Sequence, residues 1–361
     1  MATVTMTEID TSSKFFPEPF PEGLPVIDLA RISLAKLLDG DDKESSTLFE
    51  VCKDKGFCYL DLRTHEKGVR LTKQAEQMHQ AAKKFFGAPI EEKRKFNTRP
   101  PETGLLDRGY RETGCDAEGN PNKMEMVNIA QSDFFSGEEP DYQLPPFLAP
   151  YEDLFKSIMR DANEIHNVIL TILEKQLQIQ PGTFTSIHKL TQNSGDFVRV
   201  LNYPAPKDGI PLKDPPTPPH RDAVSVALLF TWQGGLQITN APNEYKRLDT
   251  ELDPEESWFY VPPIPGHVIM NLGDAMHIMT NGLLNSGKHR VVTPPGPQGR
   301  YQRLSVLLVA RPWADAKLRT VDSPLVRPGQ YLDQDLTARE WGREKVLRII
   351  GLADKAKSGK N

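Results

Sequence analysis

The spacing of apolar residues divides the chain near residue 190. In the first half, apolar residues recur mostly three and four positions apart, which predicts long helices that each bury one stripe. Thr64 is the expected N-cap of the second helix, and Gly87 follows its last turn. Short apolar runs between Pro and Gly residues predict two strands. The helices are expected at 45–55, 64–86 and 151–177, and the strands at 24–29 and 57–60.

After Pro181 the pattern changes to short runs rich in Val, Ile, Leu and Phe, separated by Pro and Gly turns. Seven or eight such strands predict a mainly β fold with a double-stranded β-helix (jelly-roll) core, rather than alternating strands and helices. A last helix is expected at about 336–356. The predicted strands are 197–203, 225–232, 235–239, 258–261, 267–272, 290–293 and 304–310.

These patterns suggest one structural domain in three parts. Residues 1–190 form a helical N-terminal region that packs on the barrel, residues 191–315 form the jelly-roll catalytic core, and residues 316–361 form a C-terminal helix and tail. The N-terminal and C-terminal helices are expected to buttress the core. A chain of 361 residues is long enough to bury such a core.

Composition and charge narrow the possible partners. The net charge of −5 gives no reason to expect binding to nucleic acid or to an anionic membrane. No apolar run approaches the ~20 residues that a membrane span needs. The three cysteines (Cys52, Cys58 and Cys115) lack metal-ligand spacing and suggest reduced thiols. We therefore expect a cytoplasmic protein with a small-molecule substrate, and the sequence leaves the oligomeric state open.

Two histidines and an aspartate are the candidate metal ligands. His220 and Asp222 are two residues apart, so on a strand their side chains point to the same face, whereas Arg221 points to the other. His289, at the edge of a later predicted strand, would complete a triad of two histidines and one carboxylate. Such a set holds one face of a metal and leaves the other open, as non-haem Fe(II) requires to bind O₂ and a co-substrate.

Arg303 and Ser305 form a second candidate group. Arg303 directly precedes the predicted strand 304–310, and Ser305 lies in it. Their side chains are two residues apart and so point to the same face. An Arg with a hydroxyl suits a carboxylate such as that of a 2-oxo acid. An exposed strand face would carry the same pair of residues. Tyr203, at the end of strand 197–203, offers a phenol to the co-substrate or the substrate, or is an aromatic residue of the barrel core.

Short motifs along nearly the whole chain resemble the Fe(II)/2-oxoglutarate-dependent oxygenases of the isopenicillin N synthase-like branch. In the first half the motifs are LPVIDL (24–29), GFCYL (56–60) and FFGAPIEEK (85–93). In the second half they are LNYP (201–204), PPHRD (218–222), GGLQI (234–238), NLGDAMHIMTNG (271–282), KHRV (288–291) and RLS (303–305). The chain departs from the branch in Arg221 and in a longer PPGPQGRYQ loop before Arg303.

The resemblance implies an oxidoreductase that uses Fe(II), O₂ and 2-oxoglutarate to oxidise a secondary metabolite. It implies that His220, Asp222 and His289 bind iron and that Arg303 and Ser305 bind 2-oxoglutarate, with Tyr203 nearby. The outcome could be hydroxylation, desaturation or ring rearrangement. An oxidase of the same fold that uses no 2-oxoglutarate, and a barrel that binds a metal or ligand without turnover, remain alternatives.

The C-terminal layout is also similar to that of the cephalosporin ring-expanding enzymes of this branch. In those enzymes an arginine ahead of the barrel motif contacts the substrate carboxylate, and Arg199 has the matching position. If alternation holds along strand 197–203, Arg199 faces the same way as Tyr203, toward the barrel interior. An arginine of an edge strand that faces solvent is the alternative.

Overall fold

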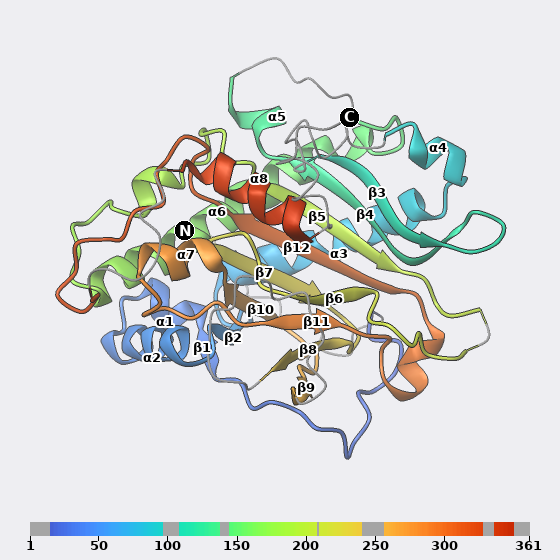
Figure 1. Cartoon of the computed structure of the whole chain (residues 1–361), viewed down its shortest axis with the longest axis horizontal. Helices are drawn as coiled ribbons and strands as arrows, with labels where there is room; N and C mark the ends of the chain where they lie inside the picture. The colour runs from blue at the N-terminus through green and yellow to red at the C-terminus, as the bar shows by residue number, and fades with distance from the viewer. Residues whose placement is uncertain are drawn as a thin grey trace, which may run out of the picture.

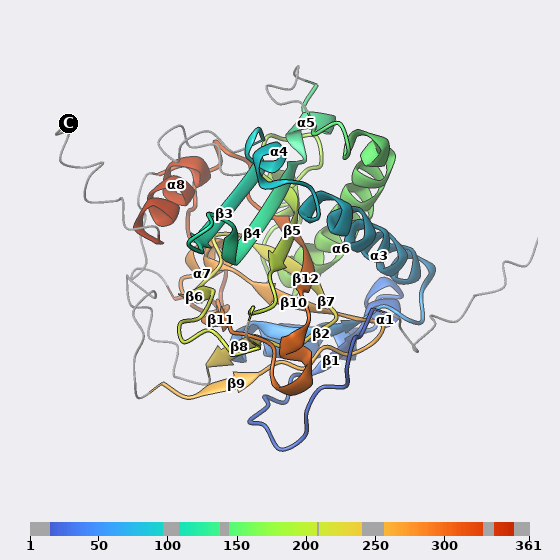
Figure 2. The same cartoon turned by 90° about the vertical axis from the view of Figure 1, so that its right-hand side faces the viewer.

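The computed structural model describes residues 15–96, 108–137, 144–207, 209–239, 256–327 and 336–349. In this part of the chain the strands form two sheets (Figures 1 and 2). The larger sheet has the order β1-β2-β10-β7-β12-β5-β4-β3 and the smaller one the order β6-β11-β8-β9. The larger sheet is made of β1 (Arg31–Ser33), β2 (Phe57–Asp61), β3 (Gly109–Cys115), β4 (Pro121–Ala130), β5 (Phe197–Tyr203), β7 (Val226–Thr231), β10 (His267–Leu272) and β12 (Arg303–Ala310). The smaller sheet is made of β6 (Thr217–His220), β8 (Leu236–Thr239), β9 (Trp258–Tyr260) and β11 (His289–Val291).

Helices cover one face of the larger sheet. In Figure 2, α3 and α6 lie to the right of β4, β5 and β12, whereas β6, β11 and α8 lie to their left. None of the helices in the described ranges has the length and apolarity that a membrane span needs. The helices are α1 (Leu34–Leu38), α2 (Asp42–Asp54), α3 (Glu66–Phe86), α4 (Ile90–Arg94), α5 (Ser132–Phe135), α6 (Glu152–Gln176), α7 (Asp274–Met279) and α8 (Ala338–Ile349).

Alternation along the strands of the larger sheet builds two apolar layers. On β5, Val198 and Val200 join the main core, which also contains residues of α3 and α6. Leu201 and Tyr203 belong to a second cluster, together with residues of the smaller sheet such as Ile238. Side chains of successive strand residues point to opposite faces, so one strand serves both layers. The second layer fills the space between the two sheets, which we call the barrel interior.

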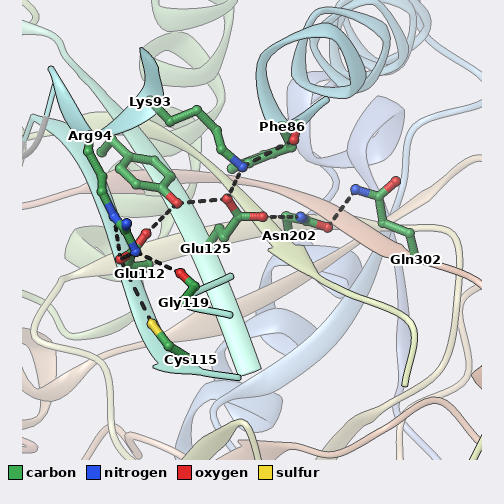
Figure 3. Close-up of polar contacts among 10 residues, drawn as sticks. Phe86, Lys93, Arg94, Glu112, Cys115, Gly119, Glu125, Asn202 and Gln302 are labelled. Atoms are coloured by element: carbon green, nitrogen blue, oxygen red, sulfur yellow. Dashed lines mark hydrogen bonds and ion pairs between the residues drawn. The ribbon is translucent and has the colours of Figure 1, made fainter. Parts of the chain in front are cut away.

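A buried polar network lies on the helix-covered face (Figure 3). The Lys93 ammonium on α4 forms an ion pair with the Glu125 carboxylate on β4, and both residues are about 5% exposed or less. The Tyr110 hydroxyl and the Asn202 amide donate further hydrogen bonds of 2.7 Å to Glu125. Gln302 in turn donates to Asn202 Oδ1. The buried charges of Lys93 and Glu125 therefore compensate each other, and hydrogen bonds complete the network.

The jelly-roll core agrees closely with the prediction. Strands β5 and β10 have the predicted bounds, and the other predicted strands of the second half differ by one or two residues at an end. Four strands were not predicted: β1, β3, β4 and β6. Among them, β3 is a largely polar edge strand whose apolar period is weak, and β6 contains Pro218 and Pro219.

In the first half, two predicted details are wrong. Residues 24–29 do not form a strand, because this segment makes only two backbone hydrogen bonds with Tyr260 of β9 before β1 begins at Arg31. Its alternation reflects Ile27 and Leu29, which pack into the barrel interior without a ladder. The N-cap of α3 is His65, not Thr64, because the His65 ring accepts the Lys67 backbone N–H.

Candidate metal centre

The pairing of β6 with β11 brings two histidines together. His220 and His289 are direct cross-strand partners, and side chains at such positions point to the same face with their Cβ atoms about 5 Å apart. The ring centroids are 4.2 Å apart. His220 Nδ1 lies 2.9 Å from the Pro218 carbonyl, and His289 Nδ1 lies 3.1 Å from the Gly287 carbonyl. When Nδ1–H donates to these carbonyls, each Nε2 lone pair is available to a metal.

Asp222 completes the group from the segment after β6. The regular strand ends at His220, so the carboxylate does not reach the site by strand alternation as expected. Asp222 Oδ1 lies 3.6 Å from His220 Nε2, and Oδ2 lies 3.7 Å from His289 Nε2. Asn271 on β10 donates a 2.9 Å hydrogen bond to Oδ2 and orients the carboxylate. A Cβ on Gly273 would lie 2.7 Å from the Asp222 carbonyl, so this turn requires glycine.

The three side chains fit one metal ion. Their ligand atoms all lie within 4.8 Å of one another. Two atoms each bonded to one ion at about 2.1 Å lie roughly 3 to 3.5 Å apart, close to the carboxylate–imidazole distances given above. Burial, together with the nearby His220, lowers the pKa of His289 to about 4, which keeps its imidazole neutral. Burial alone would raise the pKa of Asp222, but His289, His220 and the Asn271 hydrogen bond lower it, so the carboxylate is anionic.

Other polar residues near the triad in sequence point elsewhere. Arg221 is buried and donates to the Ser286 carbonyl, as expected for a side chain on the opposite face from its two neighbours. His277 is buried on α7, where its Nδ1 lies 2.9 Å from the Leu284 carbonyl. The structure therefore adds no fourth protein ligand from these positions.

Arg303 is the most completely buried large side chain of the barrel interior, at 1% exposure. Its Nε donates to the Gly234 carbonyl at 2.8 Å, and Nη1 lies 3.5 Å from Ser305 Oγ. Nη2 is buried and has no hydrogen-bond acceptor among the described residues. Gly235, beside this side chain, has a φ of +105°, and a Cβ there would lie 2.6 Å from the Val292 carbonyl oxygen, so this position requires glycine. A buried guanidinium without a carboxylate is costly, so the site fits an anionic ligand.

Tyr203 lies beside Arg303 on the neighbouring strand. The two residues are cross-strand partners, and the guanidinium carbon is 5.1 Å from the centre of the tyrosine ring. The Tyr203 hydroxyl lies 2.9 Å from Thr217 Oγ1 on β6. Tyr203 thus stacks against the cation through its ring and ties the larger sheet to the smaller one through its hydroxyl.

Arg199 faces the barrel interior with Tyr203. It is the cross-strand partner of Leu307, one side-chain row away from Ser305. Its Nε donates to Asn128 Oδ1 at 2.8 Å, and the guanidinium stacks on Phe197 at 4.3 Å from the ring centre. Burial and nearby arginines lower its pKa. The predicted orientation of Arg199 therefore agrees with the register of the sheet.

Sequence reasoning assigned no function to Asn271 or Asn128, which orient Asp222 and Arg199. A usable signal existed for Asn271, because it is the one strongly polar residue after three apolar ones in β10. Together His220, Asp222 and His289 form a group that could hold a metal ion, and a buried cation, Arg303, lies in the same barrel interior. This arrangement suits a reaction in which a metal ion and a carboxylate co-substrate bind side by side.

Comparisons with known proteins agree with this chemistry. Residues 195–312 match the family model of the 2OG-Fe(II) oxygenase superfamily, and residues 24–146 match the model described as non-haem dioxygenase in morphine synthesis N-terminal. The chain is 36% identical to a 2-oxoglutarate-dependent dioxygenase of Aspergillus fumigatus over 346 residues, covering 92% of this chain and 89% of the relative. It is 29% identical to feruloyl CoA ortho-hydroxylase 2 of Arabidopsis thaliana over 315 residues, covering 86% of this chain and 74% of the relative.

The fold is also found among solved structures. Full-length Neurospora crassa T7H in complex with alpha-KG superposes with a TM-score of 0.68 at 21% sequence identity, covering 88% of this chain and 95% of that one. At this identity the likeness concerns the fold, which is that of a double-stranded β-helix oxygenase.

Proposed function

Because this chain belongs to the 2OG-Fe(II) oxygenase superfamily, we propose that His220, Asp222 and His289 hold its Fe(II) and that Arg303 and Ser305 hold its 2-oxoglutarate. Members of this family are 2-oxoglutarate-dependent dioxygenases, which are oxidoreductases. Iron, 2-oxoglutarate and O₂ together supply the oxidising chemistry when bound, and 2-oxoglutarate leaves as succinate and CO₂.

The protein's own part in this reaction is to position the metal ligands and the co-substrate and to exclude water from them. The Nδ1 contacts of His220 and His289 fix the ring orientations, and Asn271 fixes the Asp222 carboxylate. Ser305 adds a hydroxyl beside the Arg303 guanidinium, so a carboxylate there gains a charge-assisted hydrogen bond and a neutral one. The Tyr203 ring, stacked on the guanidinium, holds it in place. Apolar residues of the barrel interior exclude water from these contacts.

The observation that carries this proposal is the buried, unpartnered Nη2 of Arg303. A fully buried guanidinium with no acidic partner among the described residues would destabilise the fold unless a ligand anion completed it. The distal carboxylate of 2-oxoglutarate supplies such an anion while its 2-oxo acid end reaches the metal. The same observation argues against an enzyme of this fold that works without 2-oxoglutarate.

We also propose a small secondary metabolite as the substrate, oxidised by hydroxylation, desaturation or ring rearrangement, and Arg199 as a residue that contacts it. Support comes from the Arabidopsis relative, which is named for hydroxylation of feruloyl CoA, and from the orientation of Arg199 toward the barrel interior. The buried free thiols of Cys52 and Cys58 support a reducing compartment, and we place the enzyme in the cytoplasm.

Calorimetric titration of the purified protein with Mn(II), under air, and then with 2-oxoglutarate tests the proposal. We expect one metal per chain and binding of 2-oxoglutarate only after the metal. Asp222→Ala and His289→Ala should abolish metal binding while the proteins remain folded by circular dichroism. With Fe(II) and O₂ the wild type should convert 2-oxoglutarate to succinate. A wild-type protein that binds neither metal nor 2-oxoglutarate would overturn the assignment.

A further inference from the structure

The PPGPQGRYQ loop, by which this chain departs from the branch that it resembles, buries a glutamine. The loop connects β11 to β12 and contains a 3-10 helix at Gly296–Arg300. Gln298 in this helix is 0% exposed, although glutamine is mostly a surface residue. Buried polar side chains in folded proteins have hydrogen-bond partners, so the partners of Gln298 indicate what the loop holds in place.

The side-chain amide of Gln298 joins two segments that lie far away in the sequence. Its Oε1 accepts the backbone N–H of Gly234, in the turn between β7 and β8, at 2.8 Å. Its Nε2 donates to the Glu18 carbonyl, in the N-terminal segment, at 2.8 Å. The Gln298 backbone carbonyl accepts a further bond of 3.2 Å from Gln233 Nε2. The loop is therefore tied both to the turn after β7 and to the N-terminal segment.

Gly234 is also the residue that holds Arg303, since its carbonyl accepts the Arg303 Nε at 2.8 Å. Glycine adopts many backbone conformations, so Gly234 does not fix the direction of this carbonyl by itself. A Cβ here would lie 2.7 Å from the Phe20 ring and 2.9 Å from Pro295 Cδ, so a less flexible residue does not fit. Contacts with other residues must therefore fix Gly234, and Gln298 supplies the one to its N–H.

We propose that Gln298 is a positioning residue for the co-substrate site. By holding the Gly234 N–H, it keeps the Gly234 carbonyl on Arg303 Nε and so keeps the guanidinium turned toward the distal carboxylate of 2-oxoglutarate. The N-terminal segment takes part, because the Glu18 carbonyl holds Gln298 and the Phe20 ring packs against Gly234. The proposal rests on the function proposed above and makes co-substrate affinity depend on residues outside the pair Arg303 and Ser305.

A purely structural role for Gln298 leads to a different expectation. If the glutamine only anchored the loop, its loss would lower the free energy of unfolding and would not discriminate between ligands of the folded protein. A positioning role confines the loss to ligands that contact Arg303. The metal ligands should not respond, because other groups orient them, namely the Pro218 and Gly287 carbonyls and Asn271.

The test compares two probes, 2-oxoglutarate and oxalate, by calorimetry on the Mn(II)-saturated protein. Oxalate chelates a metal ion through its carboxylate oxygens but has no distal carboxylate for Arg303. We expect Gln298→Leu to weaken 2-oxoglutarate binding by about three- to tenfold, the effect of one misplaced hydrogen bond. Its affinities for Mn(II) and for oxalate should equal those of the wild type. Circular dichroism and thermal unfolding check that the variant is folded.

Further variants assign the effect to the bond with Gly234. Gln298→Glu keeps an oxygen for the Gly234 N–H and should retain more 2-oxoglutarate affinity than Gln298→Leu. The matched control is Gln302→Leu, which removes a glutamine of the same loop that donates to Asn202 instead, and it should bind 2-oxoglutarate like the wild type. If Gln298→Leu does not fold, Gln298→Met, with an unbranched side chain of similar length, takes its place.

Several outcomes would overturn the proposal. These are an unchanged 2-oxoglutarate affinity in Gln298→Leu, an equal loss for oxalate, an equal loss in Gln302→Leu, or a failure of both apolar variants to fold, which would make Gln298 a structural residue. In each of these cases the wild type still binds Mn(II) and 2-oxoglutarate. A wild type that binds neither ligand would instead overturn the proposed function itself, so the two failures are told apart.

Discussion

Lys93 on α4 and Arg303 on β12 are both buried cations next to the larger sheet, and they differ in their partners. Lys93, 5% exposed, lies on the helix-covered face and forms an ion pair with Glu125, which accepts two further hydrogen bonds. Arg303, 1% exposed, lies on the interior face and has a carbonyl and a hydroxyl as neighbours, but no carboxylate of the described residues contacts it. The charge of Lys93 is therefore compensated within the fold, whereas the charge of Arg303 has no compensating carboxylate in the described part of the chain.

The difference separates structural from functional charge. Removing one member of a buried ion pair strands the other and costs stability. Removing a buried cation that has no anionic partner leaves no opposite charge unpaired and relieves desolvation, so its main cost should be in ligand binding. Substitution of Lys93 should therefore lower fold stability and leave ligand affinity unchanged. Substitution of Arg303 should weaken ligand binding and leave fold stability nearly unchanged.

The largest effect is expected from Lys93→Met. The substitution leaves the Glu125 carboxylate buried without its cation, and we expect the free energy of unfolding to fall by about 3 to 5 kcal/mol. Urea denaturation followed by tryptophan fluorescence measures this loss. The folded fraction should bind 2-oxoglutarate with unchanged affinity, because the network lies on the other face of the sheet. A loss below 1 kcal/mol would mean that Glu125 takes up a proton or reaches water.

The next effect concerns Arg303→Met and should appear in ligand binding. Loss of the charged hydrogen bonds to 2-oxoglutarate should weaken its binding by about tenfold to several hundredfold, at about 1.4 kcal/mol for each factor of ten. Stability without ligand should stay the same or rise slightly. In thermal unfolding, Mn(II) should still stabilise the variant, whereas added 2-oxoglutarate should no longer do so. Equal stabilisation of wild type and variant by 2-oxoglutarate would place the co-substrate elsewhere.

A double substitution measures how strongly the charges of Lys93 and Glu125 depend on each other, with a smaller expected change in stability. In Lys93→Met/Glu125→Gln the stranded charge is gone, while the single amide oxygen can still accept a hydrogen bond from Tyr110 or from Asn202. We expect roughly 2 kcal/mol or more of the loss in Lys93→Met to be recovered, measured as the coupling energy of a double-mutant cycle in urea. A coupling energy near zero would show that the two side chains contribute independently.

A smaller effect is expected from His166, a titratable side chain that is buried in its neutral form. It should make the free energy of unfolding depend on pH. Burial and the nearby His188 lower the pKa of His166 on α6 to about 3, against about 6.5 in an unfolded chain. Between these values the unfolded state binds a proton that the folded state does not. Stability is therefore complete above pH 6.5 and falls by about 1.4 kcal/mol per pH unit as the pH drops toward 3.

Urea titrations from pH 7 to pH 4.5 measure this dependence. His166→Leu should reduce the slope of stability against pH by about one proton, whatever its effect on stability at pH 7. His188, with a pKa lowered to about 4 by burial, should keep a remaining slope in the variant. An unchanged slope would show that His166 does not titrate in this range.

Much of the fold was predictable because its periods are local. Strands β5 and β10 and helix α6 each bury one face or both faces over their full length, so their residue types follow a simple rule. Strand β3 at the sheet edge and the Pro-containing β6 lack that signal and were missed. The segment 24–29 has the alternation of a strand without its ladder, since Ile27 and Leu29 are buried between the sheets.

Residue types and spacing predicted His220, Asp222 and His289 as a metal triad and the pair Arg303 and Ser305 as a carboxylate site, because metal and carboxylate chemistry allow few alternatives. What only the tertiary structure decided is how these groups meet. The pairing of β6 with β11 places the two imidazoles side by side, and Asn271, from a third strand, turns the carboxylate toward them. The absence of an acid beside Arg303 in the described part of the chain is likewise a property of the folded molecule. Sequence records which charges exist, but whether a charge is compensated depends on contacts between residues that lie far apart along the chain.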